Sequence, residues 1–373
     1  MRRIIKIFLL STLLIVILCI DVSADSLDDL GEVSGAYTLS EHLPKEAQEA
    51  LEKLGIENND LSTIQKLSFK DIMSYLTDTI SNETDDIKPS ICAVLAIILL
   101  YSIFSGVFES SSNSALSSVL SVVTTLCIAC SLLVPVTELI ERTSNAIEMS
   151  VNFMLAYVPV MAAVLISAGQ TVTGSGYSAM MVIAAEAVGQ FFSRVISPLL
   201  SVFLTLGISS SVVPEIKLSS LLSFFSKTVK WLMSFVFTLF TALLSLKSIF
   251  STSVDNVSSR AVRYTLSSFV PVVGGALSEA YRTVHGSVGV LKSGVGVFVI
   301  ISIVVVFVPV LTRLLVWLFT VNLCKMFAES TAMGCPVSIL SSVSTVLSLM
   351  LSVIFCIVAL FVITTALIIS LGG

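Results

Sequence analysis

Charged residues are scarce in this sequence. They make up 12% of its 373 residues, whereas hydrophobic residues make up 55% and the mean hydropathy is +1.01. A soluble domain carries about a quarter charged residues, so this composition excludes a soluble globular protein. The apolar runs are continuous rather than alternating, which favours transmembrane helices of ~20 residues over the strands of a membrane β-barrel. We therefore expect an all-α, polytopic membrane protein.

Histidine is rare as well, and the common catalytic motifs are missing. His42 and His285 are too few and too isolated for a histidine-based metal site. The sequence contains no H-E-x-x-H, no P-loop and no G-x-G-x-x-G, and no basic and aromatic surface that suggests nucleic-acid binding. Gly174–Gly176 resembles a phosphate loop in composition only, and we predict a plain turn between two spans there. We expect no enzyme, and we assign no catalytic, cofactor-binding or metal-binding residue.

The seven cysteines indicate little chemistry. Cys127 and Cys130 form a C-x-x-C pair, which suggests redox activity only in a suitable βαβ context. Here the pair lies within an apolar run and has no base nearby. We predict that both thiols serve as small packing residues.

The N-terminal region is organised like that of an exported protein. Three basic residues precede an apolar stretch, and Val22–Ala24 is a small-residue pattern that allows cleavage. We predict a signal peptide at residues 1–24, with an uncleaved anchor as the alternative. Residues 25–88 hold 15 acidic residues and five lysines, and we predict that they form an acidic, extracytoplasmic helical segment. Residues 89–373 form the polytopic transmembrane domain.

Two amphipathic helices are predicted within the acidic segment. Pro44 suits the first turn of one helix, which Gly55 ends, and Ser68 with Asp71 matches a capping box at the start of the other. Two short helices cannot bury much apolar surface by themselves. We therefore expect their apolar faces to dock on the transmembrane domain or on a partner; the residues concerned are Leu51, Leu54, Ile72 and Leu76.

We predict about seven transmembrane helices, within a range of six to eight. The uncertain run is 179–213, which charged residues and Pro198 interrupt, so that it forms one kinked helix or two short ones. Amphipathic pieces are expected between spans at Thr137–Glu148 and at 217–230, the latter as an interfacial helix. The apolar runs lie at 89–108, 115–136, 151–168, 179–213, 229–250, 294–321 and 337–371.

The distribution of lysine and arginine sets the expected orientation. With residues 25–88 outside and seven spans, residues 251–293 lie in the cytoplasm. That segment carries the densest basic group of the transmembrane domain. The basic helix at 217–230 would then face outward, which is the weaker part of this interpretation.

Ionisable residues within the spans are functional candidates, because charge is costly in lipid. Glu186, Gln190 and Arg194 follow one another at four-residue intervals, so one helical stripe carries an acid, an amide and a base. Mutual neutralisation that fixes the packing, a polar path and a partner contact all remain open. Three basic residues near the ends of runs are predicted to extend to the membrane surface: Lys247, Arg313 and Lys325.

A second candidate is a stripe of small residues around an acid and a base. If residues 275–296 are helical, a spacing of 4, 3, 4, 3, 4, 3 places seven residues on one face. Small residues allow close helix packing in membranes, and the acid and the base are near enough to pair. We predict a packing seam with another span or subunit, with a solvated cytoplasmic surface helix as the alternative. The seven residues are Gly275, Glu279, Arg282, Gly286, Gly289, Ser293 and Gly296.

Two stretches of the sequence resemble the stage III sporulation protein AE family of endospore-forming bacteria. They are "VNFMLAYVPVMAAVLISAGQTVTGSGYSAMM" (151–181) and "SSRAVRYTLSSFVPVVGGALSEAYRTVHGSVGVLKSGVG" (258–296). The layout of leader, acidic segment and multi-span domain is similar too, so the resemblance covers nearly the whole mature chain.

The resemblance implies a multi-pass protein of the mother-cell membrane around the forespore. It also implies membership of the eight-protein stage III A group, which with the forespore protein stage II Q builds a channel-like, secretion-related complex. That complex sustains forespore development and late forespore gene expression. The family has no established catalytic residues, so none is carried over.

Two functions compete at this point. The first is a non-enzymatic membrane subunit of that complex, with the lipid bilayer, the other stage III A proteins and stage II Q as partners, no nucleic acid, and a homo-oligomer left open. The second is a stand-alone secondary transporter, in which Glu186, Arg194, Glu279 and Arg282 line a substrate path. Transporters often contain internal repeats and broken helices; prolines interrupt spans here, but the sequence contains no convincing repeat.

Overall fold

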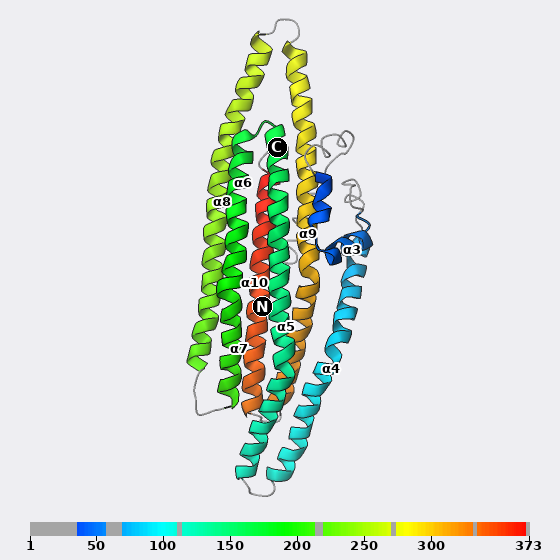
Figure 1. Ribbon diagram of the computed structural model, residues 1–373, viewed down its shortest axis with the longest axis vertical. Helices are drawn as coiled ribbons and strands as arrows, with labels where there is room; N and C mark the ends of the chain where they lie inside the picture. Colours follow the sequence, from blue (N-terminus) through cyan, green and yellow to red (C-terminus); the bar gives the residue numbers. More distant parts are fainter. Residues whose placement is uncertain are drawn as a thin grey trace.

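The computed structural model describes residues 36–56, 69–109, 114–212, 219–269, 274–330 and 334–370, and every regular element within them is helical. A short 3₁₀ helix, η1, and a short α-helix, α3, precede six long helical segments that run up and down in an elongated bundle (Figure 1). The elements are η1 (Ala36–His42), α3 (Lys45–Lys53), α4 (Phe69–Glu109), α5 (Ser114–Ser167), α6 (Thr171–Phe191), the π-helical η3 (Phe192–Ile196), α7 (Ser197–Val212), α8 (Ser219–Phe269), α9 (Gly274–Ser330) and α10 (Gly334–Ser370).

The core of the bundle is built around α10. This helix packs against α5, α7, α8 and α9, and residues such as Leu340, Val346 and Ile354 are completely buried. α4 packs on α5 and α9, whereas α8 packs on α6, α7, α9 and α10. α4 and α8 therefore form opposite edges of the bundle (Figure 1). We call the end where α8 meets α9 the upper end and the end where α9 meets α10 the lower end.

The helices are much longer than a bilayer requires. α5, α8 and α9 contain 54, 51 and 57 residues. At about 1.5 Å per residue they extend for roughly 80, 77 and 86 Å, whereas the hydrocarbon core of a membrane is ~30 Å thick. A large part of each helix must therefore lie outside the hydrocarbon.

Six helical segments in the described residues are long and apolar enough to cross a membrane, a number within the predicted range of six to eight. The two runs 115–136 and 151–168 belong to a single continuous helix, α5. The intervening piece, Thr137–Glu148, is helical as well, with its apolar side chains Leu139 and Ile147 buried in the bundle. Of the predicted interfacial helix at 217–230, residues 219–230 form the first turns of α8.

This count also bears on the expected orientation. If the continuous α5 crosses the membrane once, the upper ends of α8 and α9 lie on the same side as η1 and α3, whereas seven spans would separate them. Figure 1 places these ends of α8 and α9 at the same end of the bundle as the α5–α6 connection. The placement of residues 25–88 outside and of residues 251–293 in the cytoplasm stays a prediction.

The N-terminal elements pack against the bundle. Leu39 and Leu51 are 1% exposed and Leu54 is 7% exposed, and η1 contacts α5 while α3 contacts α9. Gln48 Nε2 joins the two elements by donating to the carbonyl oxygens of Ser40 and Leu43, at 2.9 Å each. The expected docking of Leu51 and Leu54 therefore occurs within the chain, whereas the side chains of Ile72 and Leu76 lie outside the described residues. The second predicted helix continues without a break into the first span, as α4.

The connection between α5 and α6 is shorter than predicted. α5 ends at Ser167, and Gly169 in the turn that follows has a φ of +76°, which favours glycine. Gly174–Gly176, predicted as a plain turn, lies instead within the first two turns of α6. A Cβ at Gly174 would lie 2.9 Å from Ile166 Cγ1 and 3.1 Å from the Ala162 carbonyl oxygen. The glycine is therefore needed for the close approach of α6 to α5.

Candidate functional site

An arginine inside the bundle joins three helices by ion pairs. Arg313 of α9 lies with Nη1 3.1 Å from Glu83 Oε2 of α4 and Nη2 3.8 Å from Glu138 Oε1 of α5. The side chains of Arg313 and Glu83 are only 12% and 17% exposed, whereas that of Glu138 is 45% exposed. Because both charges of the first pair are largely removed from water, each depends on the other for stabilisation. Glu138 also accepts a contact from Arg142 at 2.9 Å.

Sequence reasoning missed this cluster. Arg313 was predicted to extend to the membrane surface from the end of a run, but it lies within the long helix α9 and pairs inside the bundle. Lys325 contacts Ser341 Oγ at 3.4 Å and Glu329 at 3.8 Å, so it also has partners within the protein. The sequence signal for this cluster was a single arginine within the long apolar run of α9, together with glutamates in α4 and α5 that could pair with it.

The polar stripe Glu186, Gln190 and Arg194 lies on the outer surface of the bundle. All three residues are exposed. Gln190 Nε2 donates to Glu186 Oε2 at 3.5 Å, but in the described part of the chain neither Glu186 nor Arg194 enters an ion pair. Arg194 belongs to the π-helical turn η3, which interrupts the α-helical register between α6 and α7, and π-helical turns often occur at functional sites.

The glycine stripe lies on a single helix, α9, but its members have different surroundings. A Cβ at Gly296 would lie 2.4 Å from Ile369 Cδ1, so this glycine allows α9 to pack closely on α10. Gly286 and Gly289 have no atoms within 4 Å of such a Cβ, and Ser293 Oγ donates back to the Gly289 carbonyl at 3.1 Å. Gly275 lies in the first turn of α9, and the side chains of Glu279 and Arg282 lie outside the described residues. The structure thus leaves open space beside Gly286 and Gly289.

A buried lysine follows the open part of this stripe. Lys292 is 2% exposed, and its Nζ has no hydrogen-bond partner in the parts of the chain that the structure describes. An unpaired buried ammonium group is costly.

An aspartate from α8 caps the N-terminus of α6. Asp255 is 3% exposed and accepts hydrogen bonds from the backbone N–H groups of Thr173, at 2.7 Å, and Val172, at 3.1 Å. These are donors of the first helical turn, which have no partner within the helix, and the negative charge also suits the positive end of the helix dipole. This contact between residues more than 80 positions apart fixes the upper part of α8 against α6.

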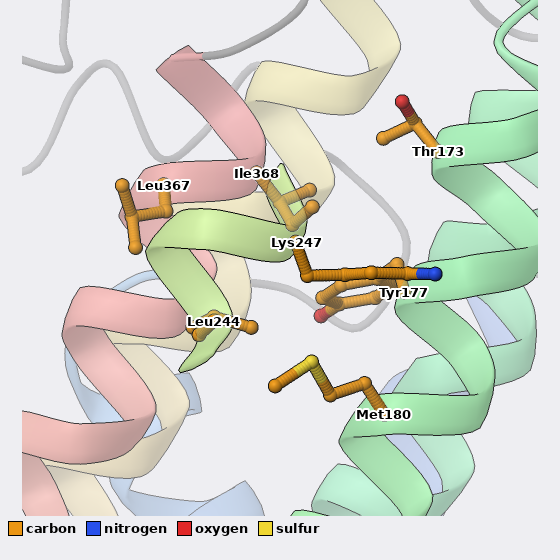
Figure 2. A pocket seen from close by; sticks show the side chains of 7 residues that line it. All are labelled: Thr173, Tyr177, Met180, Leu244, Lys247, Leu367 and Ile368. Carbon is orange, nitrogen blue, oxygen red and sulfur yellow. The ribbon is translucent and has the colours of Figure 1, made fainter. Parts of the chain in front are cut away.

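A small hollow of about 20 Å³ lies below this cap, between α6, α8 and α10. Figure 2 shows Lys247 extending from α8 across Tyr177 of α6. Apolar side chains form most of the remaining wall, and the Oγ1 of Thr173 has no hydrogen-bond partner among the described residues. The lining consists of Thr173, Tyr177, Met180, Leu244, Lys247, Leu367 and Ile368.

Neither cysteine nor histidine chemistry is assembled in the described part of the molecule. No group of three or more histidine, cysteine or acidic side chains there could hold a metal ion. Cys127 and Cys130 are exposed on α5 as free thiols, within its apolar span, so they do not pack in the core of the described bundle.

The described fold and its polar clusters define an all-helical, polytopic membrane protein. The family model described as "Stage III sporulation protein AE" matches residues 56–372, so the chain belongs to the stage III sporulation protein AE family. The chain is also similar to the stage III sporulation protein AE of Bacillus subtilis (strain 168), with 23% identity over 158 residues, which is 42% of this chain and 40% of that protein. The match thus spans well under half of the curated relative. No solved structure matches the chain.

Proposed function

We propose that this chain is a non-enzymatic membrane subunit of the sporulation complex between mother cell and forespore. It acts as a base or export-gate-like element of a channel and supports forespore development and late forespore gene expression. It lies in the mother-cell membrane around the forespore, after export directed by residues 1–24. Its partners are other stage III A proteins and, through the complex, stage II Q. Family membership supports the link to sporulation.

The observation that carries the proposal is that exposed apolar surface occurs at two different heights. Contacts along α9 and α10 provide a common scale: Lys325 lies opposite Ser341, so Arg313 lies near the level of Val353. Cys356 Sγ lies 3.9 Å from the Met233 carbonyl oxygen, which places Trp231 of α8 near the Arg313 level, with the exposed Leu221 and Phe224 below it.

From this level the part of the exposed α8 strip from Trp231 to Leu246 rises, whereas the apolar span of α4 descends. The exposed residues Trp231 to Leu246 of α8 extend roughly 22 Å toward the upper end. The span Ile87–Phe104 of α4 runs from about 6 to about 32 Å below Glu83, which pairs with Arg313. Together they cover about 55 Å, and a flat hydrocarbon layer of ~30 Å cannot cover both. One of the two surfaces must contact protein.

The charges indicate which surface that is. The exposed stripe Glu186–Arg194 lies within the height range of the α8 strip, as judged from the Thr173–Asp255 contact above it. Exposed charges are unfavourable in lipid but are common at the rims of protein interfaces. We therefore assign the α6–α8 side of the bundle to contacts with other subunits, and the docked N-terminal elements project on the same side of the membrane as the upper end.

The alternative of a stand-alone transporter requires a polar path through this chain alone. Glu186 and Arg194, which would line that path, are exposed on the outer surface instead. Purified full-length chain in liposomes tests the choice: the proposal expects no solute uptake without partners, and solute uptake by the chain alone would favour the transporter.

In parallel, the activity of a reporter for late forespore gene expression should fall when Glu186 and Arg194 are both replaced by leucine at normal protein abundance.

A further inference from the structure

The two edges of the bundle carry opposite charge. Residues 219–269, which form α8, contain five lysines and arginines and one acid. That acid, Asp255, is buried as the cap of α6. Lys227, Lys230 and Lys247 are exposed, and in the described chain none of them enters an ion pair. The α8 edge therefore presents uncompensated positive charge.

The α4 edge has the reverse composition. Residues 69–109 contain six acids and two lysines. Asp78, Asp85 and Lys88 lie on one exposed stripe of α4, and Lys88 pairs with Asp85. Asp78 is exposed and enters no ion pair in the described residues. The α4 edge therefore presents net negative charge.

These charges lie at matching heights. Lys230 lies three residues before Met233, and thus near the Arg313 level on α8. Asp78 and Asp85 lie on either side of Glu83, about 8 Å above and 3 Å below the same level. Copies that stand side by side in one membrane share this height scale, so the α8 edge of one copy meets the acidic stripe of the next at the same level.

We propose that a second copy of this chain docks head to tail, with its α4 edge against the α8 edge of the first. The two contacting surfaces differ, so the interface is heterologous, and repeated contacts of this kind close into a ring when the rotation between copies permits. Trp231 and Phe235 of α8 are stacked at 5.5 Å between ring centroids and are 65% and 51% exposed. Exposed stacked aromatics next to lysines form a suitable anchor for such an interface.

This inference deepens the proposed role as a subunit and rests on it. Membranes are prepared from cells that co-express two differently tagged full-length chains in a background whose cysteines are all replaced by alanine. One chain carries Lys230→Cys and the other Asp78→Cys, and a short bifunctional maleimide is added. We expect a crosslinked species that carries both tags, and no crosslinked species from either variant alone. Self-crosslinking of Lys230→Cys would indicate a two-fold interface and overturn the proposal, as would the absence of any crosslink between copies.

Charge reversal provides a second arm that needs no engineered cysteine. Lys230→Glu should reduce co-purification of the two tags by at least about fivefold, and Asp78→Lys in the same chain should restore it. Lys88→Glu is the matched control, because the same substitution adds negative charge to the edge that is already acidic and should leave co-purification intact. Equal losses in Lys230→Glu and Lys88→Glu would contradict the charge complementarity. Absence of self-association in the wild-type chain, with its stage III A partners still recovered, would reject this inference while leaving the proposed function standing.

Discussion

Arg313→Met should destabilise the bundle by removing the charge that joins α4 to α9. The substitution keeps a long apolar side chain but leaves Glu83, which is 17% exposed, without its partner at 3.1 Å. Removing one partner of a buried ion pair typically costs about 3–5 kcal/mol. Glu83 retains some access to water, so we expect about 3 kcal/mol. Glu138 is 45% exposed, and its contribution should stay below about 1 kcal/mol.

Two further variants test whether the loss of stability comes from breaking the buried pair or from removing an arginine of any kind. Arg142→Met removes an exposed pair with Glu138 on the same helix, and should cost no more than about 0.5 kcal/mol. Combining Arg313→Met with Glu83→Leu replaces the buried pair by apolar groups. This double variant should recover most of the loss, because the uncompensated buried carboxylate is gone.

Thermal unfolding of detergent-purified protein is a suitable assay. A thiol-reactive fluorescent dye can report the exposure of Cys324, which is 1% exposed in the folded protein, once the other six cysteines have been replaced by serine. The midpoint should fall clearly for Arg313→Met and hardly for Arg142→Met. Equal shifts in these two variants, or no recovery in the double variant, would refute the reasoning.

Three other predictions concern the remaining contacts. Asp255→Ala should lower the free energy of unfolding by about 1 kcal/mol, the usual value of a helix cap, and Asp255→Asn by less; identical midpoints for wild type and Asp255→Ala would show that the cap is dispensable. Leu51→Ser with Leu54→Ser should release the N-terminal elements from α9 and speed their digestion by protease while membrane insertion persists; an unchanged digestion rate would argue against docking. Gly296→Leu should cost about 1–3 kcal/mol and reduce abundance, because the added side chain meets Ile369. Gly286→Leu and Gly289→Leu should leave abundance normal and, if these glycines form a seam with another subunit, reduce sporulation; normal sporulation in both would reject the seam.

Local spacing in the sequence predicts much of the helical structure. Pro44 and Gly55 correctly bound the short helix α3, and Gly55 has a φ of +76° just after its end. The seven-residue stripe at 275–296 does lie on one helix. These features depend on residues within one or two turns of each other, so they are readable without knowledge of the rest of the chain.

The features that sequence reasoning missed depend on distant partners. The acids at 137–148 were interpreted as a connection between spans, but Glu138 is in reach of Arg313 on another helix, so the charge lies on a continuous α5. Asp255 carries no local signal, because the N–H groups that it binds lie 82 and 83 positions away. To interpret a charge or a proline as the end of a span is to assume that each apolar run lies in lipid by itself. Contacts between the helices remove that condition.

The central claim, that this chain is a subunit of a sporulation complex, is tested most directly by purification of its assemblies. Full-length tagged chain is crosslinked in sporulating cells and purified, and the bound proteins are identified by mass spectrometry, with an equally abundant unrelated polytopic membrane protein as the control. The account predicts specific recovery of other stage III A proteins and of stage II Q, and loss of that recovery when Glu186 and Arg194 are both replaced by leucine. Recovery of the chain without these proteins, in cells that express all of them, would contradict it.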